Sequence, residues 1–131
     1  MKSRIAAINA YRPRVKLGES VQKGELVRYL ADRTGVNEGE ISLMLAELRD
    51  AVIFFNRSGR GVKLEGLGTY LPSIDLNGAF SIDYRLDAAL KDGLNSGGKF
   101  TGVIENRTNI GKDADALVEM WNKAHSDDKV A

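Results

Sequence analysis

The residues of this sequence best suited to chemistry are arginines and lysines that could bind phosphate. Residues 1–16 contain five basic residues and no acid: Lys2, Arg4, Arg12, Arg14 and Lys16. Such a basic arm can neutralise phosphates and release counterions, which is the usual electrostatic route to nucleic-acid affinity. The alternative is a solvated, flexible terminus, since charge runs at chain ends are commonly unstructured.

The candidate nucleic-acid contacts are Arg4, Arg12, Arg14 and Lys16 of this segment and five further basic residues. The latter five lie near the entrance of a predicted strand and beside a predicted third helix: Arg57, Arg60, Lys63, Arg85 and Lys91. Phosphate contacts set affinity and register but read no sequence, so binding through them would be nonspecific and steeply salt-dependent. For each residue the alternative is an ordinary solvated surface charge.

A catalytic or metal site finds little support. Cysteine is absent, and the single histidine, His125, has no thiol or second imidazole to work with. Asp127 and Asp128 lie close to it, but a terminal acidic cluster is more typical of a solubilising tail than of a metal site. The glycines between residues 59 and 68 precede strands, unlike those of a phosphate loop. We therefore expect no enzyme, no metal and no cofactor.

Length and composition indicate one ordinary globular core with appendages. The chain has 131 residues, of which 43% are hydrophobic and 28% charged. The lack of cysteine favours a reducing compartment, and no segment is apolar for long enough to be a signal peptide or a membrane span. We expect a cytoplasmic protein, nucleoid-associated if it binds DNA, with no membrane contact.

Two helices should form the body of the fold. The first spans residues 23–34 and ends at Gly35, and the second begins after an Asn37–Glu40 capping pair. The second helix has more apolar residues than one face needs, so a partner subunit is expected to cover the remainder. The dimer-interface candidates are Leu45, Leu48, Val52, Ile53, Phe54 and Phe55.

A three-stranded meander should follow, over residues 62–65, 69–75 and 79–85. A three-residue loop, with Gly78 left-handed, sets Ile74 opposite Phe80, and it likewise pairs Pro72 with Ile82 and Tyr70 with Tyr84. The large residues then share one face of the hairpin.

The remaining elements are shorter. We expect a strand over residues 15–17, a third helix over 86–94, a strand over 100–105, and an amphipathic helix beginning at Asp113 and containing Trp121. The last six residues should be frayed.

This order of elements, with several local strings, resembles the bacterial HU and integration host factor family. The matching strings are Lys23–Leu26, Leu30–Gly35, Gly61–Tyr70 and Leu86–Leu94. The resemblance implies an intertwined homodimer with a two-helix body and a saddle of sheets. It divides the chain into a basic extension (1–22), an HU-like core (23–95) and a C-terminal extension (96–131), as in longer HU-like proteins of Bacteroidetes-type bacteria.

The hairpin departs from the family. HU proteins bend DNA with long basic arms that end in an intercalating proline. Here the loop is short, the hairpin carries two acids, Asp75 and Asp83, and only one base, Arg85, and Pro72 lies within a strand. Bending by such arms is therefore not expected.

The predicted fold class is α+β: an HU-like two-helix body, a three-stranded meander and a short third helix, with an appended strand and helix. The predicted function is that of an architectural homodimer that contacts duplex DNA nonspecifically. The alternative is a structural or protein-interaction module that kept the dimeric core and lost DNA contact. A third hypothesis makes the chain an adaptor whose acidic tail meets an additional protein partner.

Overall fold

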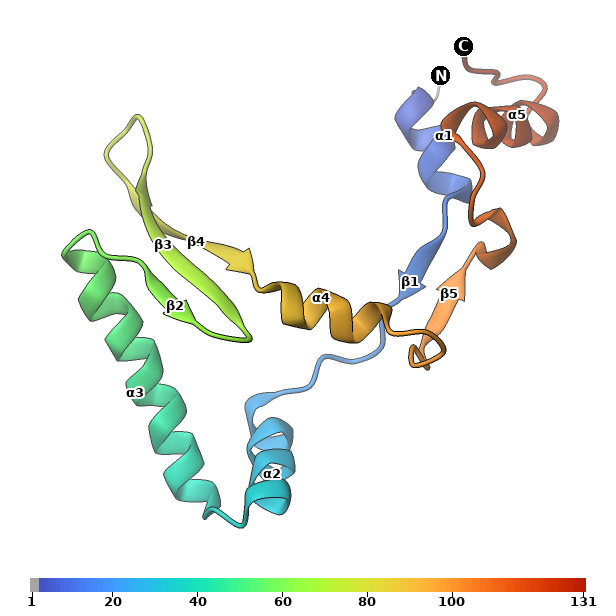
Figure 1. The fold of residues 1–131 in the computed structure, drawn as a ribbon. Coiled ribbons are helices and arrows are strands. Elements are labelled where there is room, and N and C mark those ends of the chain that lie inside the picture. The colour runs from blue at the N-terminus through green and yellow to red at the C-terminus, as the bar shows by residue number, and fades with distance from the viewer. Residues whose placement is uncertain (1–2) are drawn as a thin grey trace. The chain divides into compact units, whose positions relative to one another are not determined.

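The structure, a computed structural model, describes residues 3–131 and divides the chain into two compact units. The central unit is Ser20–Phe100. The terminal unit joins Met1–Glu19, described from residue 3 onward, to Thr101–Ala131. Segments from both ends of the chain thus fold together, and the basic head and the acidic tail belong to one unit. Figure 1 shows the elements of both units.

Two helices open the central unit. Helix α2 (Lys23–Thr34) ends at Gly35, whose φ of 74° is left-handed and whose N–H donates to the Ala31 carbonyl at 2.8 Å. Helix α3 (Glu38–Arg57) begins after Asn37, whose side-chain oxygen accepts from the Gly39 N–H at 2.7 Å. Both predicted helix boundaries are confirmed.

A three-stranded antiparallel sheet follows, in the order β2 (Val62–Leu64), β3 (Gly68–Ile74) and β4 (Phe80–Leu86). The predicted hairpin register is confirmed, because Ile74 pairs with Phe80, and the Pro72–Ile82 and Tyr70–Tyr84 pairs follow in step. Gly78 has the expected positive φ, 83°. Period-two alternation therefore places large apolar side chains on one face of the sheet.

A tight corner joins β2 to β3 and holds the start of α4 (Ala88–Asn95). The Tyr84 hydroxyl donates to the Leu67 carbonyl at 2.7 Å, and a side chain at Gly68 would meet the Arg85 carbonyl at 2.4 Å. The Asp87 carboxylate accepts from the N–H of Ala89 at 2.8 Å and of Gly66 at 3.2 Å. Asp87 therefore caps α4 and ties it to the corner.

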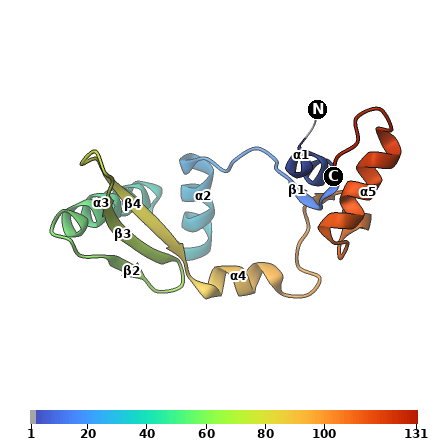
Figure 2. The same cartoon turned by 90° about the horizontal axis from the view of Figure 1, so that it is seen from above.

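The terminal unit packs α1 (Arg4–Tyr11) against α5 (Ala114–Ala124), as both views show (Figures 1 and 2). Strand β1 (Arg14–Lys16) pairs antiparallel with β5 (Val103–Glu105), and the short 3-10 helix η1 (Arg107–Asn109) follows. Helix α5 and the strand before it were predicted. The expectation that the N-terminal segment is either a phosphate-binding arm or unstructured missed α1.

The prediction that the last six residues are frayed is wrong. The Trp121 indole N–H donates to the Asp128 carbonyl at 2.8 Å. The Asn122 side chain exchanges two hydrogen bonds with the backbone of Val130, at 2.8 and 3.0 Å. The final segment therefore folds back along α5. None of the helices within residues 3–131 is both long and apolar enough to cross a membrane.

Candidate dimerisation and nucleic-acid interface

The central unit covers little of its own apolar surface. Six apolar residues are buried among the described residues, and only two of them, Val27 and Val52, lie in this larger unit. On α3, Phe54 is 69% exposed and Met44 67%. Uncovered large apolar side chains on one helix mark a candidate surface for packing against a partner.

Five of the six dimer-interface candidates retain accessible surface: Leu45, Leu48, Ile53, Phe54 and Phe55. Val52 differs, because its own chain leaves it only 9% exposed. Val52 therefore stabilises the protomer and has little surface left for a partner. The neighbouring rings of Phe54 and Phe55 meet edge to face, with centroids 5.3 Å apart.

A groove of about 590 Å³ runs between α3 and the β3–β4 hairpin. Its apolar lining comes from Ile53, Pro72, Ile74, Phe80 and Ile82. Phe80 is 81% exposed and Ile74 60%, so the groove continues the uncovered apolar surface of the central unit.

A buried amide group borders this groove. The Asn56 Nδ2 donates to the carbonyls of Arg60 at 3.0 Å and Tyr70 at 3.4 Å, but its Oδ1 has no donor within the described residues. A buried acceptor left unpaired costs about 1–3 kcal/mol. The groove itself is lined mainly by apolar side chains and therefore suits an apolar occupant.

The other face of the sheet carries two of the candidate phosphate contacts. Lys63 pairs in register with Thr69, which pairs with Arg85, so the three residues form one row across the strands. Both cationic side chains are exposed. Asp83 shares this face two positions from Arg85, which lowers the net positive charge of the row.

The remaining central candidates are more scattered. Arg57 ends α3 and borders the groove, whereas Lys91 is exposed on α4. The Arg60 guanidinium lies over the Phe55 ring, 5.2 Å from its centroid, which orients it by a cation–π contact.

The N-terminal candidates divide into paired and unpaired cations. Arg4 forms an ion pair with Asp115, and Arg14 with Glu105 at 3.1 Å. Their charge is already partly neutralised within the terminal unit. Within the described residues, the Arg12 side chain bonds only to the neutral Asn9 side chain, at 2.9 Å, and Lys16, exposed on β1, has no acidic partner within salt-bridge distance.

Two cations that were not among the predicted candidates, Arg107 and Lys112, are held near the end of α1. The Asn106 side chain donates to the carbonyls of Ala10 and Arg12, at 3.2 and 3.1 Å, and Asn109 donates to that of Tyr11 at 2.7 Å. These bonds clamp residues 106–109 to the end of α1. Arg107 lies within this clamped segment. Lys112 is held next to the segment, because its Nζ donates to Asn109 Oδ1 at 3.1 Å.

The clamp formed by the Asn106 and Asn109 hydrogen bonds was difficult to predict from the sequence. Asn106 adopts a left-handed φ of 57°, which asparagine tolerates better than most residues. Two asparagines three positions apart after a short strand were the only hint of it.

Asp87 and His125, two titratable residues of the chain, make structural contacts. Hydrogen bonds from the backbone of Ala89 and Gly66, aided by the charge of Lys63, hold the pKa of Asp87 below its ordinary value. His125 stacks on Trp121 with centroids 3.6 Å apart. Within residues 3–131 no group of three His, Cys, Asp or Glu side chains is placed to hold a metal ion.

No protein-family model and no curated protein matches the sequence. Among solved structures, an HU mutant from Thermotoga maritima matches with a TM-score of 0.48 and 18% identity, over 56% of this chain and 99% of that one. Anabaena HU, from a cocrystal with DNA, matches with a TM-score of 0.48 and 17% identity, over 57% and 98%. The chain itself has an α+β fold, with a three-stranded sheet and three helices in the central unit and further elements in the terminal unit.

Proposed function

We propose that this chain is the protomer of a non-enzymatic homodimer that contacts duplex DNA through its phosphates, without reading sequence. The observation that carries the proposal is the uncovered apolar surface of α3 and the hairpin groove, where Phe54 is 69% and Phe80 81% exposed. A twofold axis lets two copies cover the same surface on each other.

The DNA-binding half of the proposal rests on exposed cations and on the sequence resemblance to HU and integration host factor proteins. Lys63 and Arg85 lie on the sheet face opposite the apolar one, so a dimer that buries the apolar face leaves both residues accessible. Arg57, Arg60 and Lys91 add further candidate contacts. Side chains of this kind bind the backbone and not the base edges.

One observation favours the second candidate, a dimeric protein-interaction module. The central unit contains ten Lys and Arg residues against eleven Asp and Glu residues, so its net charge is −1. An overall negative charge opposes association with DNA. The short hairpin adds Asp75 and Asp83 and lacks a basic arm.

Two measurements test the proposal. Sedimentation equilibrium should give twice the protomer mass, and a monomer that stays folded at high dilution would refute the dimer. Titration of a mixed-sequence duplex should show binding at about 50 mM salt that falls steeply by about 200 mM. Absence of binding at the lower salt concentration would leave the interaction module as the function.

A charge reversal localises the contact in the central unit. Arg60→Glu should weaken duplex binding and leave the circular dichroism spectrum unchanged, because the Arg60 side chain is exposed. Unchanged affinity would remove Arg60 from the interface.

A further inference from the structure

The terminal unit contains a concentration of basic residues that the central unit lacks. Between residues 10 and 18 and between 101 and 112 the only acid is Glu105, which is paired with Arg14. Among the described residues, the cations of these segments without an acidic partner within salt-bridge distance are Arg12, Lys16, Arg107 and Lys112. We call these four residues the basic corner.

Hydrogen bonds hold part of the basic corner in place. The Asn106 and Asn109 side chains donate to three successive carbonyls at the end of α1, which fixes η1 beside Arg12. Asn109 is only 4% exposed, so this clamp is part of the folded interior. Arg107 and Lys112 therefore flank a rigid element and not a loose terminus.

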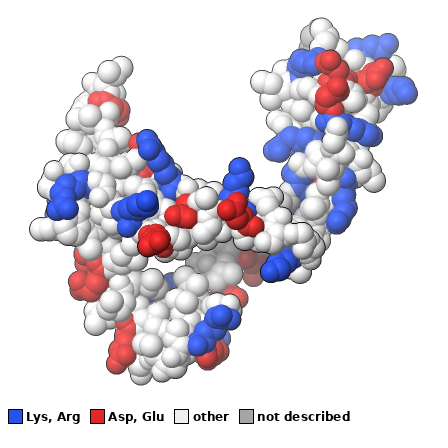
Figure 3. Space-filling view, viewed as in Figure 1, with Lys and Arg blue, Asp and Glu red and all other residues white. Residues whose placement is uncertain are grey.

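Two acids that follow Lys112 in the sequence are already engaged within the terminal unit. Asp113 caps α5 by accepting from the Ala116 N–H at 2.8 Å, and Asp115 pairs with Arg4. In Figure 3, blue side chains follow the β1–β5 ribbon, and both red and blue side chains lie where α1 and α5 lie. The β1–β5 end of this unit is therefore predominantly basic, whereas the α1–α5 end carries charges of both signs.

We propose that the basic corner is a second phosphate-binding surface, and that it contributes more of the affinity for duplex DNA than the sheet of the central unit does. This inference rests on the proposed function and locates its main contact. The terminal unit contains nine basic and seven acidic residues, a net charge of +2, against −1 for the central unit. Unpaired cations on a rigid element release counterions from DNA without first breaking an ion pair.

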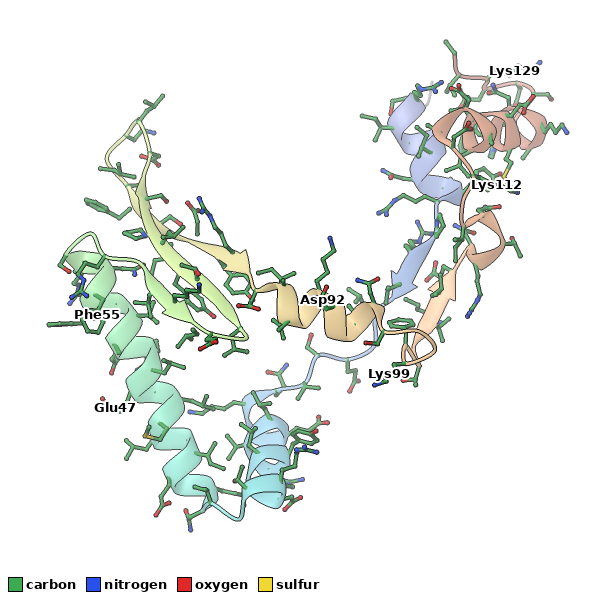
Figure 4. All side chains as sticks on the ribbon, in the orientation of Figure 1. Glu47, Phe55, Asp92, Lys99, Lys112 and Lys129 are labelled. Carbon is green, nitrogen blue, oxygen red and sulfur yellow. The ribbon has the colours of Figure 1, made fainter. Side chains whose placement is uncertain are left out.

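The chain supplies a matched control. Arg107→Gln with Lys112→Gln removes two charges from the basic corner, and Lys123→Gln with Lys129→Gln removes two from the α1–α5 end of the same unit. Figure 4 shows Lys112 close to the end of α1 and Lys129 in the final segment beyond α5. Both double variants of the full chain have the same net charge.

Salt titration of duplex binding measures the number of contacts. Each phosphate contact contributes about −0.9 to the slope of log K against log salt, so the slope measured for the corner variant should be less steep by about 1.8 per protomer. The corner variant should also bind duplex at least tenfold more weakly than the wild type at about 100 mM salt. The control variant should keep the slope of the wild type. Equal slopes for all three proteins would overturn the inference while leaving the proposed function standing.

Two further results separate the remaining outcomes. If Arg60→Glu leaves affinity intact and the corner variant loses it, the inference holds and Arg60 is removed from the phosphate contacts. If the wild type does not bind duplex at about 50 mM salt, both the inference and the proposed DNA binding are wrong. Should the double variant fold poorly, Arg107→Gln alone repeats the test, because the Arg107 side chain is exposed and makes no hydrogen bond within residues 3–131.

Discussion

Truncating Phe54 should dissociate the proposed dimer. Fully burying a phenylalanine side chain stabilises by about 1.5–3 kcal/mol. Since 69% of Phe54 is left exposed by its own chain, each copy can contribute about 1–2 kcal/mol to association. A twofold dimer contains two copies, so Phe54→Ala should weaken it by about 2–4 kcal/mol, which raises the dissociation constant about 30- to 700-fold.

Sedimentation equilibrium over a range of protein concentrations measures this constant. Leu17→Ala is the matched control, because Leu17 is an apolar residue that is 86% exposed but lies in the terminal unit. The control should associate like the wild type. If Phe54→Ala dimerises as tightly as the wild type, the uncovered face of α3 is not the interface and the reasoning is refuted.

Two other predictions concern the corner between β2 and β3. Gly68→Ala should lower the free energy of unfolding by about 1–3 kcal/mol in denaturant titration, because its Cβ would lie 2.4 Å from both a β4 carbonyl and a tyrosine ring. Gly93→Ala, in open space within α4, should instead stabilise by about 0.5–1 kcal/mol, and equal effects would contradict this geometry. Asp87→Asn should reduce stability at neutral pH, since hydrogen bonds favour the charged carboxylate and lower its pKa. Because the folded pKa lies below the ordinary one, the stability difference should persist above roughly pH 5 and vanish as the pH falls through the lowered pKa, as paired thermal melts would show.

Local chemistry was sufficient to predict most of the central unit. Gly35 and Asn37 mark a helix end and a helix start, because a left-handed glycine and an asparagine cap act within one turn of chain. The hairpin register followed from period two and loop length, since a one-residue slip would have mixed Ile74 with Ser81. The excess of apolar residues on α3 was also visible, because it is a property of composition and helical spacing.

The terminal unit depended on contacts between distant parts of the chain. Helix α1 has eight residues, too few to be stable alone, and it gains its stability by burying Ala7 against α5. The sequence showed the cations of the N-terminal segment but not their ion-pair partners. It therefore could not distinguish Arg4 and Arg14, which are paired with acids, from Lys16 as candidate phosphate contacts.

The amino-acid sequence alone thus determined the helices of the central unit, the hairpin register and the surplus of apolar surface, because each depends on residues only a few positions apart. Only the tertiary structure decided which cations remain unpaired and which stand together. Arg12 and Arg107 are neighbours through the Asn106 clamp, and such a contact between segments more than 90 residues apart leaves no periodic trace in either segment. The candidate phosphate surface is therefore a product of folding and not of any local motif.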